Sequence, residues 1–190
     1  MRKVILLMHV SLDGFVAGPN GEMDWIIVNE EMYEGVNKIL EDVDTPIYGR
    51  VTYGMMESYW PTIPSNPSSS ALERKHAEWV EKVHKIVFSR TLDKVEWNNT
   101  RLIKENISEE MAKLKQKEGK NMMIFGSPGL SHTFMSLGLI DEYRLNINPV
   151  ILGEGIPLFK NIDGKINLRL LESEQLKSGV VGLHYESVRR

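Results

Sequence analysis

The sequence predicts an α/β protein with a central, mostly parallel sheet and antiparallel strands at the C-terminal end. In the first two thirds of the chain, short apolar runs alternate with helical patterns, which is typical of parallel strands joined by helical crossovers. In the last third, polar and apolar residues alternate as in antiparallel strands. The length of 190 residues suits one well-buried domain, so we expect a single domain over residues 1–190.

Four apolar runs and the more polar segment 100–105 are the expected parallel strands, because a strand covered on both faces reads as a nearly continuous apolar stretch. They are KVILLMHV (3–10), TPIYG (45–49), KIVFSR (85–90), TRLIKE (100–105) and NMMIFGS (121–127). Helices between them would cover both faces and give a three-layer α/β/α arrangement. The expected antiparallel strands are EYRLNINPVIL (142–152), INLRLLESEQL (166–176) and VVGLHYESV (180–188), with a hairpin turn at 178–179.

Helical spacing predicts three helices in the first half of the chain. The apolar stripe of the first consists of Met32, Val36, Ile39, Leu40 and Val43. A second helix is expected from about Val51, and ALERKHAEWVEKV (71–83) predicts a third. The polar segment WPTIPSNPSSS (60–70) between them contains three prolines, and we interpret it as a flexible surface excursion.

Two later helices are predicted from the residues at their ends. Ser108 is the expected N-cap of one helix, which would stop at Gly119. A second helix is expected to open at Ser127 and Pro128 and to end at Gly138. Its inward-facing residues would be Leu130, Phe134 and Leu137.

Composition excludes several classes of protein. The net charge of −3 does not suit a nucleic-acid-binding domain, which carries a basic face. The absence of cysteine excludes disulfides, thiolate metal sites and the H-x-E…P-C-x-x-C zinc site of deaminases, and no metal site is expected. No apolar run approaches the roughly 18 residues of a membrane span. We expect a cytoplasmic protein that binds neither nucleic acid nor a membrane.

Three turns predict a site for a phosphorylated ligand. YGRVT (48–52), FSRTL (88–92) and FGSPGL (125–130) each follow an apolar strand and contain glycine or serine. In parallel sheets, ligands bind beyond the carboxyl ends of strands, where helix starts present N–H groups. For Arg50, an ordinary surface arginine near a helix start is the alternative. Because a cation at a helix start is unfavourable for the helix itself, the position favours a bound anion. Neither GxGxxG nor GxxxxGK[ST] is present, and a standard Rossmann or phosphate-loop site is not expected.

The order of these segments resembles a known family. SLDGFVAGPNGEMDW (11–25), GRVT, IVFSR and IFGSPGL together resemble the dihydrofolate reductase superfamily. Within it, SLDG, YGRVTYGMM, SYWP and EYRLNINPVILGEGIPLF are similar to the riboflavin-biosynthesis reductase branch, which includes the C-terminal half of the bifunctional deaminase-reductase. The resemblance covers essentially the whole chain. It implies a dihydrofolate reductase-like fold, NADPH as the cofactor and, by analogy with that branch, a homodimer.

The resemblance also implies which residues contact NADPH. The adenine-side phosphates would be bound by Gly49, Arg50 and Thr52, with Arg50 on the 2′-phosphate, and the same end of the cofactor by Ser89 and Arg90. The turn beside the pyrophosphate and the nicotinamide corresponds to Gly126, Ser127, Pro128 and Gly129. Ser127 stands where the family usually has a glycine. The nicotinamide would be bordered by His9, Val16 and Ala17.

Four carboxylates are candidates for the catalytic acid. Dihydrofolate reductases place a carboxylate five or six residues after a loop tryptophan, and Glu30 and Glu31 lie at those distances from Trp25. Both glutamates also suit the first turn of a helix. The resemblance puts Asp13 at the substrate ribose, although an aspartate before glycine is also ordinary turn chemistry. Asp24, beside Trp25, is the fourth candidate.

Three aromatic residues are candidates for contact with a planar substrate, namely Trp25, Tyr53 and Trp60. For Trp60, packing in the core is the alternative. The sequence thus predicts an NADPH-dependent reductase acting on a small heterocyclic substrate, most like 5-amino-6-(5-phosphoribosylamino)uracil reductase of riboflavin biosynthesis. A dihydrofolate or pterin reductase, and a non-catalytic NADPH-binding module, are the alternatives.

Overall fold

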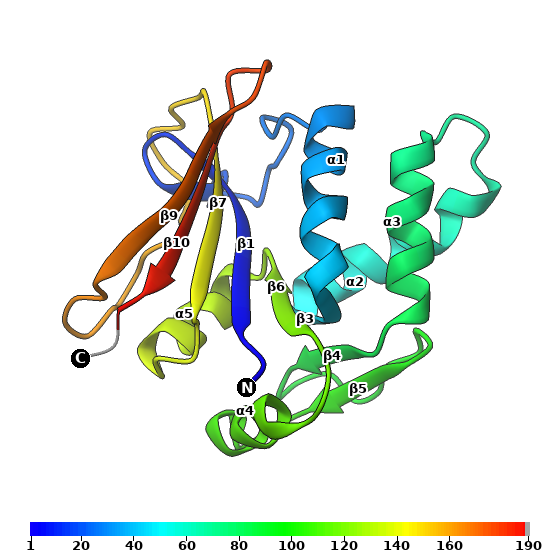
Figure 1. Ribbon diagram of the computed structural model, residues 1–190, viewed down its shortest axis with the longest axis vertical. Coiled ribbons are helices and arrows are strands. Elements are labelled where there is room, and N and C mark those ends of the chain that lie inside the picture. The colour runs from blue at the N-terminus through cyan, green and yellow to red at the C-terminus, as the bar shows by residue number, and fades with distance from the viewer. Residues whose placement is uncertain (189–190) are drawn as a thin grey trace. The chain divides into compact units, whose positions relative to one another are not determined.

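A computed structural model of the chain describes residues 1–188, and its backbone contacts group into two compact units (Figure 1). The first unit contains Met1–Arg2 and Val28–Met123. The second contains Lys3–Ile27 and, within the described residues, Ile124–Val188. Strand β6 (Asn121–Phe125) contributes residues to both units.

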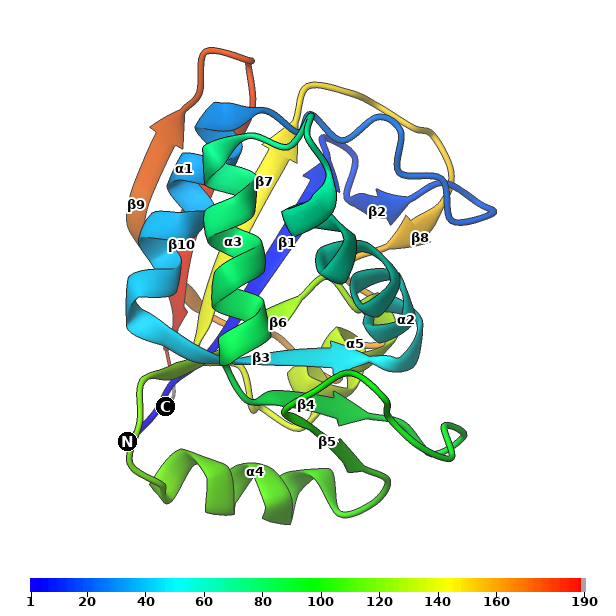
Figure 2. The ribbon, with the colours of Figure 1, turned by 90° about the vertical axis from the view of Figure 1, so that its right-hand side faces the viewer.

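The first unit is a parallel sheet with helices. Its strands are β3 (Val43–Gly49), β4 (Lys85–Phe88), β5 (Thr100–Ile103) and the first part of β6, in the order β5-β4-β3-β6. Both β3–β4 and β4–β5 pair in parallel. The helices are α1 (Glu30–Ile39), α2 (Arg50–Tyr59), α3 (Ala71–Lys82) and α4 (Ile107–Gln116). Helices α3 and α4 lie on opposite sides of these strands (Figure 2).

Local sequence explains where these helices begin. The side chain of Asn29 accepts a hydrogen bond from the Met32 N–H, and that of Ser70 accepts one from the Glu73 N–H, so α1 and α3 have side-chain N-caps. The prediction of Ser108 as the N-cap of α4 is wrong. The cap is Asn106, which adopts a left-handed conformation (φ 55°) that asparagine tolerates better than most residues.

Two other expectations for the first unit are also wrong. Val43 does not belong to the apolar stripe of α1, because the helix ends in a short 3₁₀ turn (Leu40–Asp42) and Val43 begins β3. The segment 60–70 is not a loose excursion. It contains the 3₁₀ helix η2 (Trp60–Ser65), in which Trp60 and Ile63 are buried, and the Arg74 guanidinium donates to backbone carbonyls of the segment.

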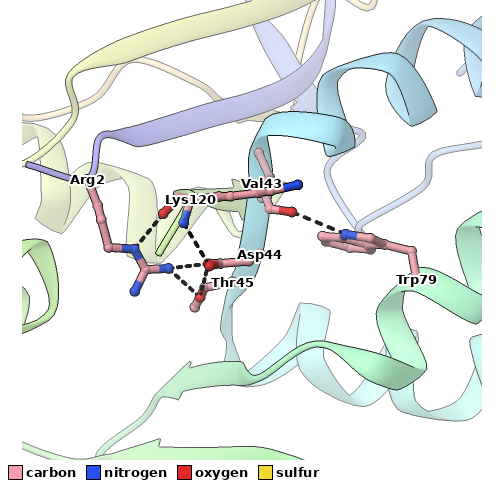
Figure 3. A network of polar contacts seen from close by, with 6 residues as sticks. All are labelled: Arg2, Val43, Asp44, Thr45, Trp79 and Lys120. Atoms are coloured by element: carbon pink, nitrogen blue, oxygen red, sulfur yellow. Dashed lines mark hydrogen bonds and ion pairs between the residues drawn. The ribbon is translucent and has the colours of Figure 1, made fainter. Parts of the chain in front are cut away.

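A buried arginine organises one end of the first unit (Figure 3). The Arg2 guanidinium pairs with Asp44 and donates to the Thr45 hydroxyl (2.6 Å) and to the Lys120 carbonyl. Asp44 also accepts a hydrogen bond from the Lys120 N–H (2.8 Å). A Cβ at Gly119 (φ +143°) would lie 2.7 Å from the Asp44 carboxylate, so this packing requires glycine there.

The second unit combines parallel and antiparallel pairs. Its strands are β1 (Val4–Ser11), β7 (Glu142–Asn148), β9 (Leu168–Gln175) and β10 (Val181–Ser187). The order is β6-β1-β7-β10-β9, in which β1–β7 is parallel and β7–β10 and β10–β9 are antiparallel. Helix α5 (Pro128–Ser136) and a small antiparallel pair, β2 (Phe15–Ala17) and β8 (Ile156–Pro157), complete it.

The predicted fold class and the predicted C-terminal hairpin are confirmed. The turn between β9 and β10 contains Gly179 (φ +88°), and the Leu176 N–H donates to the Val180 carbonyl. On α5, Leu130 and Phe134 are buried as predicted, but Leu137 is 46% exposed, because it lies beyond the last helical residue. No helix within residues 1–188 is long and apolar enough to cross a membrane.

Candidate functional site

Strand register brings two of the predicted phosphate turns together in the first unit. Gly49, the last residue of β3, pairs with Phe88, the last residue of β4. The next residues of the two strands, Arg50 and Ser89, therefore lie side by side at the carboxyl edge of the parallel strands. This edge is where ligands bind in sheets of this class.

The electrostatics of this edge suit an anion. Arg50 and Arg90 are exposed, and neither side chain makes a hydrogen bond or an ion pair with another residue of the described chain. Gly49 is the N-cap of α2 and supplies no capping side chain, and the first turn of α2 contains no acidic residue. The positive end of the helix dipole is therefore not neutralised by any group of this helix.

The other predicted residues of these turns have local roles. The Ser89 hydroxyl accepts hydrogen bonds from the N–H groups of Thr91 (3.2 Å) and Leu92 (3.0 Å), which fixes the turn after β4. Thr52 is half-buried in the first turn of α2.

Tyr53 and Trp60 pack within the first unit. The Tyr53 hydroxyl donates to Glu57 (2.6 Å) and accepts from the Trp97 N–H (3.1 Å), so it holds the segment before β5. Trp60 is 7% exposed and stacks on His76, with ring centroids 4.3 Å apart. These contacts account for both aromatic side chains structurally.

Glu30 and Glu31 occupy the first turn of α1, directly after the Asn29 cap. Glu30 is exposed and Glu31 is half-buried. Carboxylates at this position stabilise the helix through its dipole.

In the second unit, the glycine turn after β6 lies against β1. The Gly126 N–H donates to the Leu7 carbonyl (3.1 Å), two residues before His9. Gly126 and Ser127 both have a φ of 56°, and the Ser127 hydroxyl donates to the Phe125 carbonyl (3.1 Å). Pro128 is the first residue of α5, as predicted, and Gly129 is exposed in its first turn.

His9 is the least satisfied polar group of this region. Its ring is half-buried, and Nδ1 is shielded from solvent without a hydrogen-bond partner in the described chain. Burial lowers the pKa of His9 to about 4, so the ring is neutral near pH 7. A buried nitrogen without a hydrogen-bond partner is costly to the stability of the fold.

The loop after β1 carries the remaining candidates. Asp13 accepts three hydrogen bonds, from the Ser11 hydroxyl (2.7 Å), the Leu152 N–H (3.1 Å) and the Gly153 N–H (2.7 Å). These hydrogen bonds lower the pKa of the Asp13 carboxyl below its ordinary range, and the bond from Ser11 has the largest effect. Asp24 is exposed and makes no hydrogen bond or ion pair in the described chain.

The structure also describes the surroundings of three further candidates near this loop, Trp25, Val16 and Ala17. Trp25 is half-buried, and its Nε1–H donates to the Glu22 carbonyl (3.1 Å). Val16 and Ala17 are buried in β2, where Ala17 pairs with Ile156 of β8.

Sequence reasoning missed two residues that shape this region. His132 of α5 contacts the carbonyls of Pro157 (3.1 Å) and Leu158 (2.9 Å) through Nε2, which must carry a proton because carbonyls only accept. A Cβ at Gly155 (φ +151°) would lie 2.2 Å from the Ala17 carbonyl oxygen, so only glycine fits. The glycines of LGEGIP were the available signal, whereas nothing local identifies the partner of His132.

A family model, the RibD C-terminal domain, matches residues 2–182. The chain belongs to this family. It is 41% identical over 184 residues to the uncharacterized protein YyaP of Bacillus subtilis (strain 168), covering 97% of this chain and 94% of that protein.

Solved structures confirm the fold of this RibD C-terminal domain family member. The crystal structure of a putative riboflavin biosynthesis protein from Shewanella sp. PV-4 superposes with a TM-score of 0.77 at 23% identity, covering 98% and 99% of the two chains. Dihydrofolate reductase from Enterococcus faecalis, complexed with NADP(H), gives a TM-score of 0.60 at 13% identity and coverages of 97% and 96%. The predicted dihydrofolate reductase-like fold and the predicted branch are therefore confirmed.

Proposed function

We propose that this protein is an NADPH-dependent reductase that transfers a hydride to a small heterocyclic substrate, most like 5-amino-6-(5-phosphoribosylamino)uracil reductase. Membership of the RibD C-terminal domain family supports a reductase. The observation that carries the cofactor proposal is the pair of exposed, unpaired arginines on neighbouring turns, Arg50 and Arg90. We also propose that the whole chain, residues 1–190, is one reductase domain; Arg189 and Arg190 lie outside the described residues.

The residues fit NADPH in two respects. The two guanidinium groups suit phosphate oxygens, and the uncapped start of α2 offers N–H donors beside them. Gly126 lets the backbone of the turn after β6 approach a cofactor closely. When bound, NADPH supplies the hydride.

The contacts proposed for the cofactor follow the three groups predicted from the sequence. Phosphate contacts come from Gly49, Arg50, Thr52, Ser89 and Arg90. Contacts to the pyrophosphate and nicotinamide come from Gly126, Ser127, Pro128, Gly129, His9, Val16 and Ala17.

For the proton that accompanies hydride transfer, we propose Asp24, Glu30 or Glu31 as the acid. Asp13 is a weaker candidate, because a carboxylate that accepts three hydrogen bonds holds its proton poorly. Of the variants Asp24→Asn, Glu30→Gln and Glu31→Gln, we expect the one that removes the acid to lower kcat ~10²–10⁴-fold, and the other two to change kcat little. We propose Trp25 as a contact to the substrate ring, and Tyr53 and Trp60, which are both buried, as indirect supports through packing.

The test of the proposed function is a titration of the purified protein with NADPH and, separately, NADH, followed by tryptophan fluorescence. We expect saturable quenching with a clear preference for NADPH. Aminouracils and pterins are then screened for oxidation of NADPH at 340 nm (the absorbance of the reduced nicotinamide). Folded protein that binds neither cofactor would contradict the proposal, and binding without turnover of any substrate would favour a non-catalytic module.

We further propose that the protein is a homodimer in which the C-terminal strands meet the second copy. All eight residues of β9, the last strand in the sheet order, are exposed. Leu168 and Leu170 are 36% and 50% exposed, and they lie opposite Ser187 and Tyr185 on one face of the β9–β10 pair. Apolar side chains on an exposed edge strand favour association.

A further inference from the structure

The loops that follow β1 and β7 are joined through a single carboxylate. The strands β1 and β7 are parallel neighbours whose last residues, Ser11 and Asn148, are paired. Their carboxyl ends therefore lie at the same edge, where a ligand is bound in such sheets. Asp13 belongs to the first loop, and the backbone N–H groups of Leu152 and Gly153 that it binds belong to the second.

The bonds of Asp13 use both of its oxygens. Oδ1 accepts from the Ser11 hydroxyl and from the Leu152 N–H, whereas Oδ2 accepts from the Gly153 N–H at 2.7 Å. Ser11 is buried, and its hydroxyl in turn accepts from the Phe15 N–H (2.9 Å). A chain of hydrogen bonds thus runs from the start of β2 through Ser11 and Asp13 to the loop after β7.

The two loops stay in contact beyond Asp13. The Leu12 N–H donates to the Val150 carbonyl (2.8 Å), and the Leu158 N–H donates to the Gly14 carbonyl (2.9 Å). The strands β2 and β8 lie side by side in Figure 2 and pair in antiparallel fashion. Residues 150–154 contain no helix or strand. Where their N–H groups donate to the β1–β2 loop, the acceptor is Asp13.

We propose that Asp13 is a positioning residue, which shapes the substrate side of the site by holding residues 150–154 in place, and not the proton donor. The role at the substrate side rests on the proposed function, whereas the contact between Asp13 and residues 150–154 does not. A charged acceptor forms stronger hydrogen bonds than a neutral one. An asparagine at the same place has one oxygen and one amino group, and the amino group cannot accept from the Gly153 N–H.

Amide hydrogen exchange on the Asp13→Asn variant tests the contact without any substrate. We expect the amides of Leu152 and Gly153 to exchange ~10-fold faster or more than in the wild type, since they lose a charged acceptor. The amides of β7 should keep their exchange rates. Glu154→Gln is the matched control, because it removes a carboxylate from the same loop that makes no hydrogen bond or ion pair in the described chain. Unchanged exchange in Asp13→Asn would overturn the proposal.

Kinetics on an identified substrate then separate positioning from acid catalysis. For Asp13→Asn we expect a several-fold higher KM, a kcat within ~3-fold of the wild type, and an unchanged pH profile of kcat. A kcat lowered ~10²-fold or more, with loss of one limb of the pH profile, would identify Asp13 as the acid and refute positioning. If the wild type neither binds NADPH nor turns over a substrate, the proposed function fails, while the exchange experiment still decides whether Asp13 holds the loop.

Discussion

Arg50 and Arg90 show how a residue's environment indicates a ligand. Each side chain is exposed at the start or end of an element, with no protein partner in the described chain. For Arg50, the positive end of α2 makes the position unfavourable in the absence of an anion. We therefore propose that these two residues, which lie on neighbouring turns, bind one phosphorylated ligand.

A cofactor comparison tests this explanation. If either arginine contacts the 2′-phosphate, replacing it with alanine should weaken NADPH binding by ~10–100-fold, as for a hydrogen bond to a charged group. NADH binding should change little, because NADH lacks that phosphate. Fluorescence titration of Arg50→Ala and Arg90→Ala with both cofactors measures the difference. Equal weakening of both cofactors would show that the arginines support the structure instead.

Ser127 carries a second residue-scale prediction. Its φ of 56° lies in the left-handed region, and it is buried directly before α5. A β-branched residue tolerates this conformation poorly. We expect Ser127→Val to lower the free energy of unfolding by about 2 kcal/mol, and Ser127→Gly to change it by less than about 1 kcal/mol. Urea denaturation measures both. Similar values for the two variants would show that backbone strain is not the cause.

His9 makes the stability of the fold dependent on pH. Its pKa is about 4 in the folded protein, below the 6.5 of a free imidazole. The neutral form is therefore favoured by folding, so this contribution is present above pH 6.5 and is lost as the pH falls from 6.5 through 4.

We expect the wild type to lose on the order of 2 kcal/mol more than His9→Gln over this window. Burial also lowers the pKa of His76 to about 4. Because His76 is present in both proteins, it contributes equally to the pH dependence of both unfolding free energies. Urea midpoints measured at intervals of pH give the comparison. If the unfolding free energies of the wild type and His9→Gln change equally with pH, the pKa of His9 is not lowered by folding and the prediction is wrong.

Among the elements, β3 and the segment before β6 depend on the Arg2 cluster of Figure 3. Only 8% of the Arg2 side chain is exposed, and Asp44 is its carboxylate partner. Removing one member of a buried ion pair leaves the other charge uncompensated, which costs more than the pair contributes.

Asp44→Ala should therefore lower the free energy of unfolding by about 2–3 kcal/mol. The loss includes the hydrogen bonds that Asp44 accepts from Thr45 and Lys120. Asp42→Ala is the control, because Asp42 is exposed nearby and makes no hydrogen bond or ion pair through its side chain in the described chain. An equal, small effect of both substitutions on chemical denaturation would count against the cluster.

Sequence predicted the elements better than it predicted their ends. Apolar runs and helical stripes predicted the longer strands and the α-helices, because both patterns depend on near neighbours along the chain. They did not predict the short strands β2 and β8 or the 3₁₀ helix η2. The caps were less predictable. Ser108 has the usual residue type for an N-cap, but the cap of α4 is the left-handed Asn106, two residues earlier. The packing of Trp60 in the core, one of the two alternatives given from the sequence, is confirmed. Ile63 lies in the same polar segment, and its burial in η2 was not predicted.

For the whole molecule, the exposed leucines of β9 predict self-association. We expect light scattering after size-exclusion chromatography to give about twice the chain mass of 21.7 kDa. Leu170→Lys places a charge on the apolar face of the β9–β10 pair and should give a monomer. Glu172 lies opposite His184, on the other face of the pair, so Glu172→Lys should remain dimeric. A wild-type monomer would contradict the proposed homodimer.

The sequence by itself determined the fold class, the family resemblance and the turns expected to hold the cofactor, because these depend on local patterns and their order. The tertiary structure decided which turns meet. The register that pairs Gly49 with Phe88 puts Arg50 beside Ser89, and no local pattern encodes a register. Asp13 bonds to N–H groups 139 and 140 residues away, so its ordinary turn motif concealed its partner. The contacts of Arg50 and Asp13 therefore depend on the long-range pairing of strands and not on residue type alone.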